Sequence, residues 1–176
     1  MARQILFEGR FVRLVRDDHW EWAERTNTAC AVVIVAVTRQ REIVLTEQYR
    51  IPLAARVVEL PAGLVGDLPH QGAEDKIEAA RRELLEETGF ASEDWQPLVE
   101  GPVSAGMSNE LAALYLARNV WAAGKGGGDA SESIEVHVVH LDRAEQFLAD
   151  RRRQGALVDP KVYAGLYFAQ QAAGRR

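Results

Sequence analysis

Hydrophobic and polar residues alternate along the first part of the chain, as they do in β-strands with one buried face. The stretch "RFVRLVRD" alternates clearly, whereas "ACAVVIVAVT" is a continuous run rich in β-branched residues. We therefore expect strands over residues 10–17, 20–27, 29–38, 41–50 and 56–60.

The pattern then changes to the period of a helix, over about Ala73–Thr88. Four residues spaced three or four apart form a stripe that should face the core: Ile77, Ala80, Leu84 and Thr88. Gly89 follows where a helix commonly ends on a left-handed residue. A single amphipathic helix is expected here.

Strands and helices are mixed in the second part of the chain. Alternation predicts strands over residues 95–101, 110–120 and 134–141. Helices are expected over residues 142–154 and 159–173. Asp159 is the expected N-cap of the last helix, with Pro160 at its first position. The Gly-rich stretch "AGKGGGDASES" reads as a flexible loop. This order predicts an α+β fold, a mixed sheet with helices against its faces.

Composition narrows the function classes. The chain has 176 residues, of which 47% are hydrophobic and 27% charged, so one globular domain is expected. Its net charge of −5 argues against bulk attraction to nucleic acid. No apolar run approaches the length of a membrane span, and the N-terminus lacks the apolar core of a secretory signal. We expect a cytoplasmic protein without membrane or nucleic-acid partners.

The single cysteine, Cys30, lies in the apolar run of residues 29–38. One cysteine cannot form a disulfide within the chain, and a thiolate metal site would need further cysteines or histidines nearby. We expect Cys30 to be a buried strand residue.

Three glutamates stand close together on the predicted helix. Glu83 and Glu87 are four residues apart and lie one above the other beside the apolar stripe, and Glu86 lies further round. Like charges at this spacing cost about 0.2–0.5 kcal/mol per pair. Two interpretations remain open, a solvated acidic face and a divalent cation held by the carboxylates. Carboxylates beside the carbonyls of a turn suit Mg²⁺ or Mn²⁺ better than Zn²⁺.

The stretch "GAEDKIEAARRELLEETGF" resembles the Nudix box, the signature of enzymes that hydrolyse nucleoside diphosphates linked to another group. The pattern Arg-Glu-apolar-x-Glu-Glu-x-Gly-apolar matches residues 82–90, and Glu74 matches the upstream glutamate. Ten residues separate Gly63 from Glu74, more than the family pattern has. Insertions in loops are tolerated, so the departure affects loop geometry rather than the helix.

The resemblance covers most of the chain and is strongest to ADP-ribose pyrophosphatases. It rests on the segments "WEWAERT", "EQYRIPLAARVVELPAGL", "VSAGMSNE", "GGGDASESIEVHVV" and "DPKVYAGLYF". It implies a single Nudix domain over residues 1–176, with N-terminal dimerisation strands over about 1–28 and the Nudix core over about 29–176. It also implies a homodimer with an intertwined N-terminal arm.

The resemblance assigns roles residue by residue. Metal would be held by the Ala62 carbonyl, Glu83 and Glu87, with Glu86 supporting. Glu132 takes the place of the catalytic loop glutamate, and Glu86 is the alternative base. The implied substrate contacts are Trp20, Glu21, Arg25, Arg50, Arg56 and Glu59. Each has a plainer structural alternative: Trp20 as a packing residue, Arg50 in an ion pair with Glu47 or a neighbour, Glu132 as one more loop carboxylate.

The implied reaction is hydrolysis of the pyrophosphate bond of ADP-ribose to AMP and ribose 5-phosphate, with Mg²⁺ as the expected ion and Mn²⁺ as an alternative. Other nucleoside diphosphate sugars are a second interpretation, because few contacts set specificity. A non-catalytic binding module is the third. The intact glutamates at 83, 86 and 87 disfavour that third interpretation.

Overall fold

The structure, a computed structural model, describes residues 3–28, 30–66, 74–128 and 133–174. Its strands are β1 (Gln4–Glu8), β2 (Val12–Asp17), β3 (Trp20–Arg25), β4 (Cys30–Thr38), β5 (Glu42–Arg50), β6 (Ala55–Glu59), β7 (Ala62–Leu64), β8 (Phe90–Ala91), β9 (Asp94–Pro102), β10 (Leu111–Ala122), β11 (Glu135–His140) and β12 (Leu157–Val158). Its helices are α1 (Lys76–Thr88), α2 (Ala144–Arg153) and α3 (Pro160–Gly174), with 3₁₀ turns at Ile51–Leu53 and Leu141–Arg143. The predicted α+β class is confirmed.

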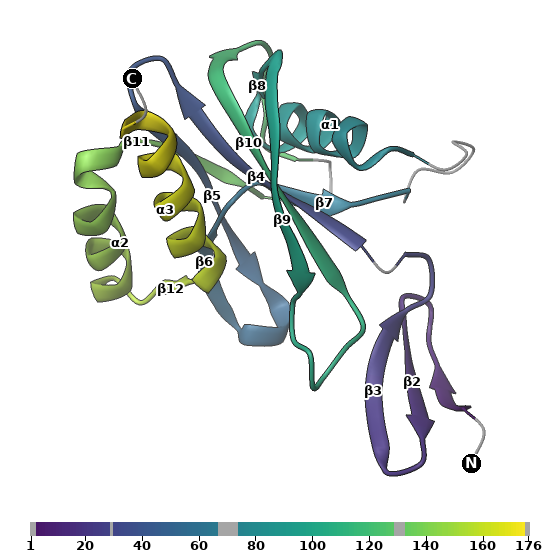
Figure 1. Cartoon of the computed structure of the whole chain (residues 1–176). Coiled ribbons are helices and arrows are strands. Elements are labelled where there is room, and N and C mark those ends of the chain that lie inside the picture. Colours follow the sequence, from purple (N-terminus) through teal and green to yellow (C-terminus); the bar gives the residue numbers. More distant parts are fainter. Residues whose placement is uncertain (1–2, 29, 67–73, 129–132, 175–176) are drawn as a thin grey trace.

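A mixed sheet forms the body of the molecule, with α1 on one face and α2 and α3 on the other (Figure 1). Its main path runs β12-β6-β5-β4-β10-β8, and β4 pairs in parallel with β10. Val33 and Val35 pack toward α2 and α3, whereas Val32 and Ile34 pack toward α1. The apolar run of β4 is therefore continuous because both of its faces are core.

Helix α1 begins at Lys76, three residues later than predicted. Asp75 has an extended backbone, and its side chain accepts a hydrogen bond from the Ile77 N–H, so it is the N-cap. The helix ends as predicted at Gly89, which has φ +74° and donates its N–H to the Leu85 carbonyl.

The core face of α1 is broader than the predicted stripe. Ala80, Leu84 and Thr88 are buried as expected, and Ile77 is only half-buried. Glu83 and Glu87, expected beside the stripe, are also buried, with 8% and 5% of their surface exposed. These two carboxylates therefore belong to an interior site rather than to a solvated face.

The shortest strands leave no recognisable pattern in the sequence. β7, β8 and β12 contain two or three residues each, too few to show a period. The predicted start of α3 is confirmed, because Asp159 accepts from the Lys161 N–H at 2.7 Å and Pro160 is the first helical residue. Cys30 begins β4 as expected, but it is half-buried rather than buried.

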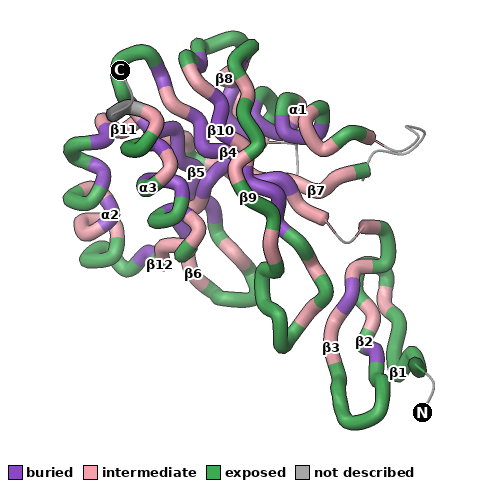
Figure 2. Tube along the Cα trace, in the orientation of Figure 1, coloured by how far each residue is buried: buried purple, intermediate pink, exposed green. Residues whose placement is uncertain are grey.

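The first three strands form a separate antiparallel sheet, β1-β2-β3, beside the body (Figure 1). The Ala23 N–H donates to the Met107 carbonyl at 2.8 Å, which attaches this arm to the loop between β9 and β10. Most of the arm is exposed (Figure 2), including Phe7 at 67%, Phe11 at 60% and Trp20 at 57%. No helix among the described residues is long and apolar enough to cross a membrane.

Candidate active site

A cleft of about 830 Å³ opens where α1, β7, the β5–β6 hairpin and the arm approach one another. Its lining includes all four residues of the predicted metal set, Ala62, Glu83, Glu86 and Glu87. Three of the six predicted substrate contacts line it as well: Arg25, Arg50 and Glu59. Among these predicted residues, the fold brings together side chains that lie up to 62 positions apart in the sequence, from Arg25 to Glu87.

Strand β7 lies directly against the glutamates of α1. The Ala62 N–H donates to Glu87 Oε2 at 3.0 Å. A Cβ atom on Gly63 would come within 1.9 Å of the Glu83 carboxyl carbon, so only glycine leaves room for that carboxylate. Strand β7 thus brings the Ala62 N–H and Gly63 directly beside the two buried carboxylates.

Arg82 holds the carboxylates of the box in place. Its guanidinium donates to Glu74 Oε1 at 3.1 Å, to Glu83 Oε1 at 2.7 Å and to Glu86 Oε2 at 3.2 Å. It also donates to the Leu64 carbonyl at 3.2 Å, which ties the helix to the end of β7. The repulsion among the glutamates is thus offset in part by an arginine.

Glu74 takes its place despite the long segment before it. The hydrogen bonds from Arg82 lower its pKa, and the Gly66 N–H donates to its Oε2 at 2.9 Å. The extra residues between Gly63 and Glu74 therefore leave the pairing of Glu74 with Arg82 intact.

The donor set fits a hard divalent cation. Glu83, Glu86, Glu87 and the Ala62 carbonyl offer oxygen atoms, and no cysteine or histidine lines the cleft among the described residues. Oxygen-only donors suit Mg²⁺ or Mn²⁺ rather than Zn²⁺. Glu86 is 54% exposed at its side chain, so it faces the solvent-filled part of the cleft.

Two arginine–glutamate pairs lie across the cleft from the box. Arg50 binds Glu59 through two hydrogen bonds of 2.8 and 3.0 Å, and Arg25 of the arm is ion-paired with Glu110. Paired with Glu59 rather than Glu47, Arg50 presents a guanidinium to the cleft in a fixed orientation. These cations are suited to an anionic substrate.

The remaining predicted contacts lie elsewhere in this chain. Arg56 binds Glu47 and Glu135 on the opposite face of the β5–β6 hairpin and does not line the cleft. Trp20 and Glu21 lie at the exposed end of β3, also outside the lining. Glu132 lies outside the described residues.

Glu110 and Lys161 line the cleft but were not among the predicted site residues. Both lie in segments that carried the resemblance, "VSAGMSNE" and "DPKVYAGLYF". The pairing of Arg25 with Glu110 joins residues 85 positions apart, and no local pattern could reveal it.

Comparisons with known proteins point to one family. Residues 27–159 match the model of the NUDIX domain. The methanol dehydrogenase activator of Bacillus methanolicus is 31% identical over 94% of this chain and 88% of its own. The ADP-ribose pyrophosphatase of Bacillus subtilis is 28% identical over 97% of this chain and 91% of its own.

A crystal structure of an ADP compounds hydrolase superposes with a TM-score of 0.74 at 18% identity, over 100% of this chain and 95% of that one. At this identity the likeness establishes the fold. Together with the intact glutamate box at the cleft, the family match means that the chain belongs to the NUDIX domain family and is a Nudix hydrolase of the ADP-ribose pyrophosphatase-like branch.

Proposed function

We propose that this protein hydrolyses the pyrophosphate bond of ADP-ribose to AMP and ribose 5-phosphate, with Mg²⁺ as cofactor. The observation that supports the proposal is that Glu83, Glu87 and Ala62 line one cleft with Arg25 and Arg50. The similarity to the Bacillus subtilis ADP-ribose pyrophosphatase over nearly the whole of both chains supports this substrate.

Each side of the cleft has a distinct part in the reaction. The carboxylates of Glu83 and Glu87, oriented by Arg82 and by the Ala62 N–H, would hold the cation. When bound, Mg²⁺ supplies charge neutralisation at the pyrophosphate and lowers the pKa of a water molecule. Arg25 and Arg50 bind the anionic substrate from the opposite side. Glu132, or Glu86 in its place, accepts the proton of the attacking water.

Other nucleoside diphosphate sugars are the second candidate. The charged groups of the cleft recognise a pyrophosphate rather than a particular base or sugar. Base recognition in our proposal falls to Trp20 and Glu21, which lie on the exposed arm. We infer that the protein is a homodimer in which the arm meets a second copy, since the arm exposes Ile5, Phe7, Phe11 and Trp20.

A hydrolysis screen tests the proposal. ADP-ribose, other nucleotide sugars and dinucleotides are incubated with the protein in Mg²⁺ and in EDTA, and the products are identified. We expect ADP-ribose to have the highest kcat/KM and EDTA to abolish turnover. A preference of more than about tenfold for another nucleotide sugar, equal to about 1.4 kcal/mol, would assign that substrate instead.

The variants Glu83→Gln and Glu87→Gln test the metal assignment in the same assay. Each keeps the shape of its side chain but loses the charge, so turnover should fall on the order of a thousandfold, or about 4 kcal/mol. Glu78→Gln is the matched control, because Glu78 is exposed on α1 and does not line the cleft. Near-normal turnover of both box variants at limiting Mg²⁺ would refute the assignment.

A further inference from the structure

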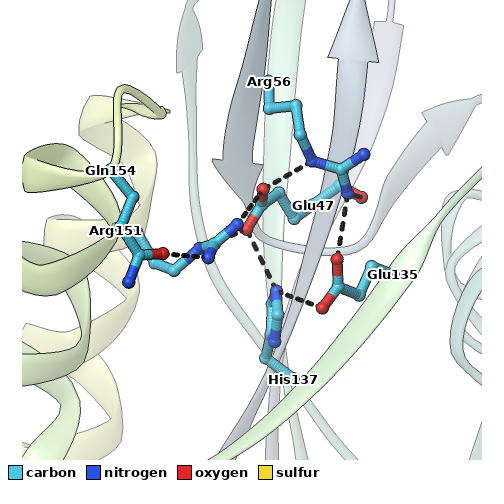
Figure 3. Close-up of polar contacts among 6 residues, drawn as sticks. All are labelled: Glu47, Arg56, Glu135, His137, Arg151 and Gln154. Atoms are coloured by element: carbon cyan, nitrogen blue, oxygen red, sulfur yellow. Dashed lines mark hydrogen bonds and ion pairs between the residues drawn. The ribbon is translucent and has the colours of Figure 1, made fainter.

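A second charged cluster lies on the other face of the β5–β6 hairpin, around Glu47 (Figure 3). Glu47 is 0% exposed. Arg151 of α2 donates to both of its carboxylate oxygens, at 2.7 and 2.5 Å. Arg56 of β6 donates to Oε1 at 2.7 Å and to the Glu47 carbonyl at 3.3 Å. We call Glu47, Arg56, Arg151, His137 and Glu135 the Glu47 cluster.

The cluster is bound together more tightly than a surface ion pair. His137 Nε2 lies 3.1 Å from Glu47 Oε2, and Arg56 donates to Glu135 at 3.1 Å. Burial alone would raise the pKa of Glu47, yet hydrogen bonds from Arg151, Arg56 and His137 lower it to about 2. One carboxylate thereby joins α2, β6 and β11 to β5.

A metal ion is a poor alternative occupant. Ligand atoms of Glu47, Glu135 and His137 lie within 4.8 Å of one another. However, the guanidinium groups of Arg56 and Arg151 already lie within hydrogen-bonding distance of the Glu47 carboxylate. With two arginines and two glutamates, the cluster balances its charge without a cation, and a divalent ion would face both guanidinium groups.

The hairpin carries an equivalent ion pair on its cleft face. Successive side chains of a strand point to opposite faces, so Glu47 and Arg50, three positions apart, point in opposite directions. The same holds for Arg56 and Glu59 on β6. One ion pair therefore lies on each face of the hairpin, Glu47 with Arg56 on the α2 face and Arg50 with Glu59 on the cleft face.

The turn at the end of this hairpin is exposed. Ile51 is 83% exposed and Leu53 56% in the 3₁₀ turn that joins the two strands. Ala54 adopts a left-handed conformation with φ +48°, which is unfavourable for a residue with a Cβ atom. Arg50 thus lies at the boundary between the strand that the cluster fixes and an exposed, strained turn.

We propose that the Glu47 cluster positions the Arg50–Glu59 pair for substrate binding, and that Glu47, Arg56 and Arg151 are positioning residues of the cleft. The proposal rests on the proposed function, because it assigns Arg50 to the substrate. It also gives Arg56 a role other than direct substrate contact. A shift of about 1 Å in a group that contacts the substrate can cost on the order of a hundredfold in rate. Even a small displacement of Arg50 on loss of the cluster should therefore weaken substrate binding.

Kinetics of Glu47→Gln separate positioning from stability. Glutamine keeps the size of the side chain but removes the charge that holds both arginines. KM should rise about tenfold while kcat stays within about threefold, because binding rather than chemistry is perturbed. In an Arg50→Ala background, Glu47→Gln should change KM by less than about twofold. The reason is that Glu47 affects substrate binding through Arg50, which this background already lacks.

Leu148→Ala is the matched control. Leu148 is a buried core residue of α2, 1% exposed, that makes no contact with the cluster by hydrogen bond or ion pair. Its loss destabilises α2 through a cavity, and KM should stay unchanged. An equal KM rise in Leu148→Ala, or a Glu47→Gln variant with lowered Tm and normal KM, would reduce the cluster to a structural role and overturn the proposal.

Amide hydrogen exchange gives a readout that does not depend on activity. In Glu47→Gln the amides of residues 50, 51 and 53–55 should exchange at least about tenfold faster, whereas Leu148→Ala should leave them unchanged. Unchanged exchange in Glu47→Gln would also overturn the proposal. If the wild type hydrolyses another nucleotide sugar instead of ADP-ribose, the KM test is made with that substrate, so the two proposals fail separately.

Discussion

Gly63→Ala should disable the cleft while leaving the fold nearly intact. The added Cβ would lie 1.9 Å from the Glu83 carboxyl carbon and 2.0 Å from its Oε1. To restore an ordinary contact of about 3.5 Å, the carboxylate must move by at least about 1.5 Å. The backbone of Gly63 does not have a positive φ, so alanine is not strained there in itself.

That displacement is large for a metal ligand. Mg²⁺ requires bond lengths of about 2.0–2.1 Å and near-ideal octahedral geometry. Moving Glu83 also breaks its 2.7 Å contact with Arg82. We expect kcat/KM to fall by about 10²–10³, equal to about 3–4 kcal/mol, with a larger Mg²⁺ concentration at half-maximal rate.

The assay is a Mg²⁺ titration of ADP-ribose hydrolysis, with a denaturant melt of the same preparation. Overpacking should cost about 1–3 kcal/mol of stability at most, because the neighbour is the end of a flexible side chain. Gly101→Ala in β9 is the control, since a Cβ there meets nothing within 4 Å. If Gly63→Ala stays within about threefold of wild type at limiting Mg²⁺, the geometry of Glu83 is not what the reaction needs.

Three further predictions follow from the same structure. Leu84→Ala should cost about 2–5 kcal/mol of unfolding free energy, because Leu84 is 0% exposed between α1 and the sheet; a loss below about 1 kcal/mol in denaturant melts would contradict this packing. The pKa of Glu47 is lowered from 4.5 to about 2, so its ionised carboxylate should add about 3 kcal/mol to the unfolding free energy above pH 4.5, and this stabilisation is lost as the pH falls toward 2. The difference in unfolding free energy between wild type and Glu47→Gln should therefore narrow over that pH range. A constant difference would contradict the lowered pKa. Trp20→Ala should raise KM, because base stacking worth about 1–3 kcal/mol is lost. Glu132→Gln should instead lower kcat by about 10²–10⁴. The reverse pattern would mean that the two roles are exchanged.

Local patterns were sufficient for much of this fold. The strand β4, the C-cap at Gly89 and the N-cap at Asp159 each depend on residues close together in the sequence. The predicted start of α1 was three residues too early, because Asp75 is the N-cap although the residues before it fit a helical pattern. Strands of two or three residues show no period and could not be predicted from alternation.

The site depends on contacts between distant segments, and these limit what a sequence can show. Glu83 and Glu87 are buried because β7 packs against them, and a helical wheel shows only the residues of the helix itself. The partner of Arg50 proved to be Glu59 of the neighbouring strand, because the hairpin register puts both side chains on the cleft face. The same register turns Arg56 away from the cleft, a consequence of strand alternation that becomes visible only once the hairpin is known.

The proposed reaction can be tested most directly by ³¹P NMR of ADP-ribose with wild type and with Glu87→Gln, each in Mg²⁺. We expect the pyrophosphate resonances of ADP-ribose to disappear with wild type and to be replaced by those of AMP and ribose 5-phosphate. With Glu87→Gln the pyrophosphate resonances should persist on the same timescale. Equal conversion by both proteins would contradict the assignment of the Glu87 carboxylate, and intact ADP-ribose in both samples would contradict the proposed substrate.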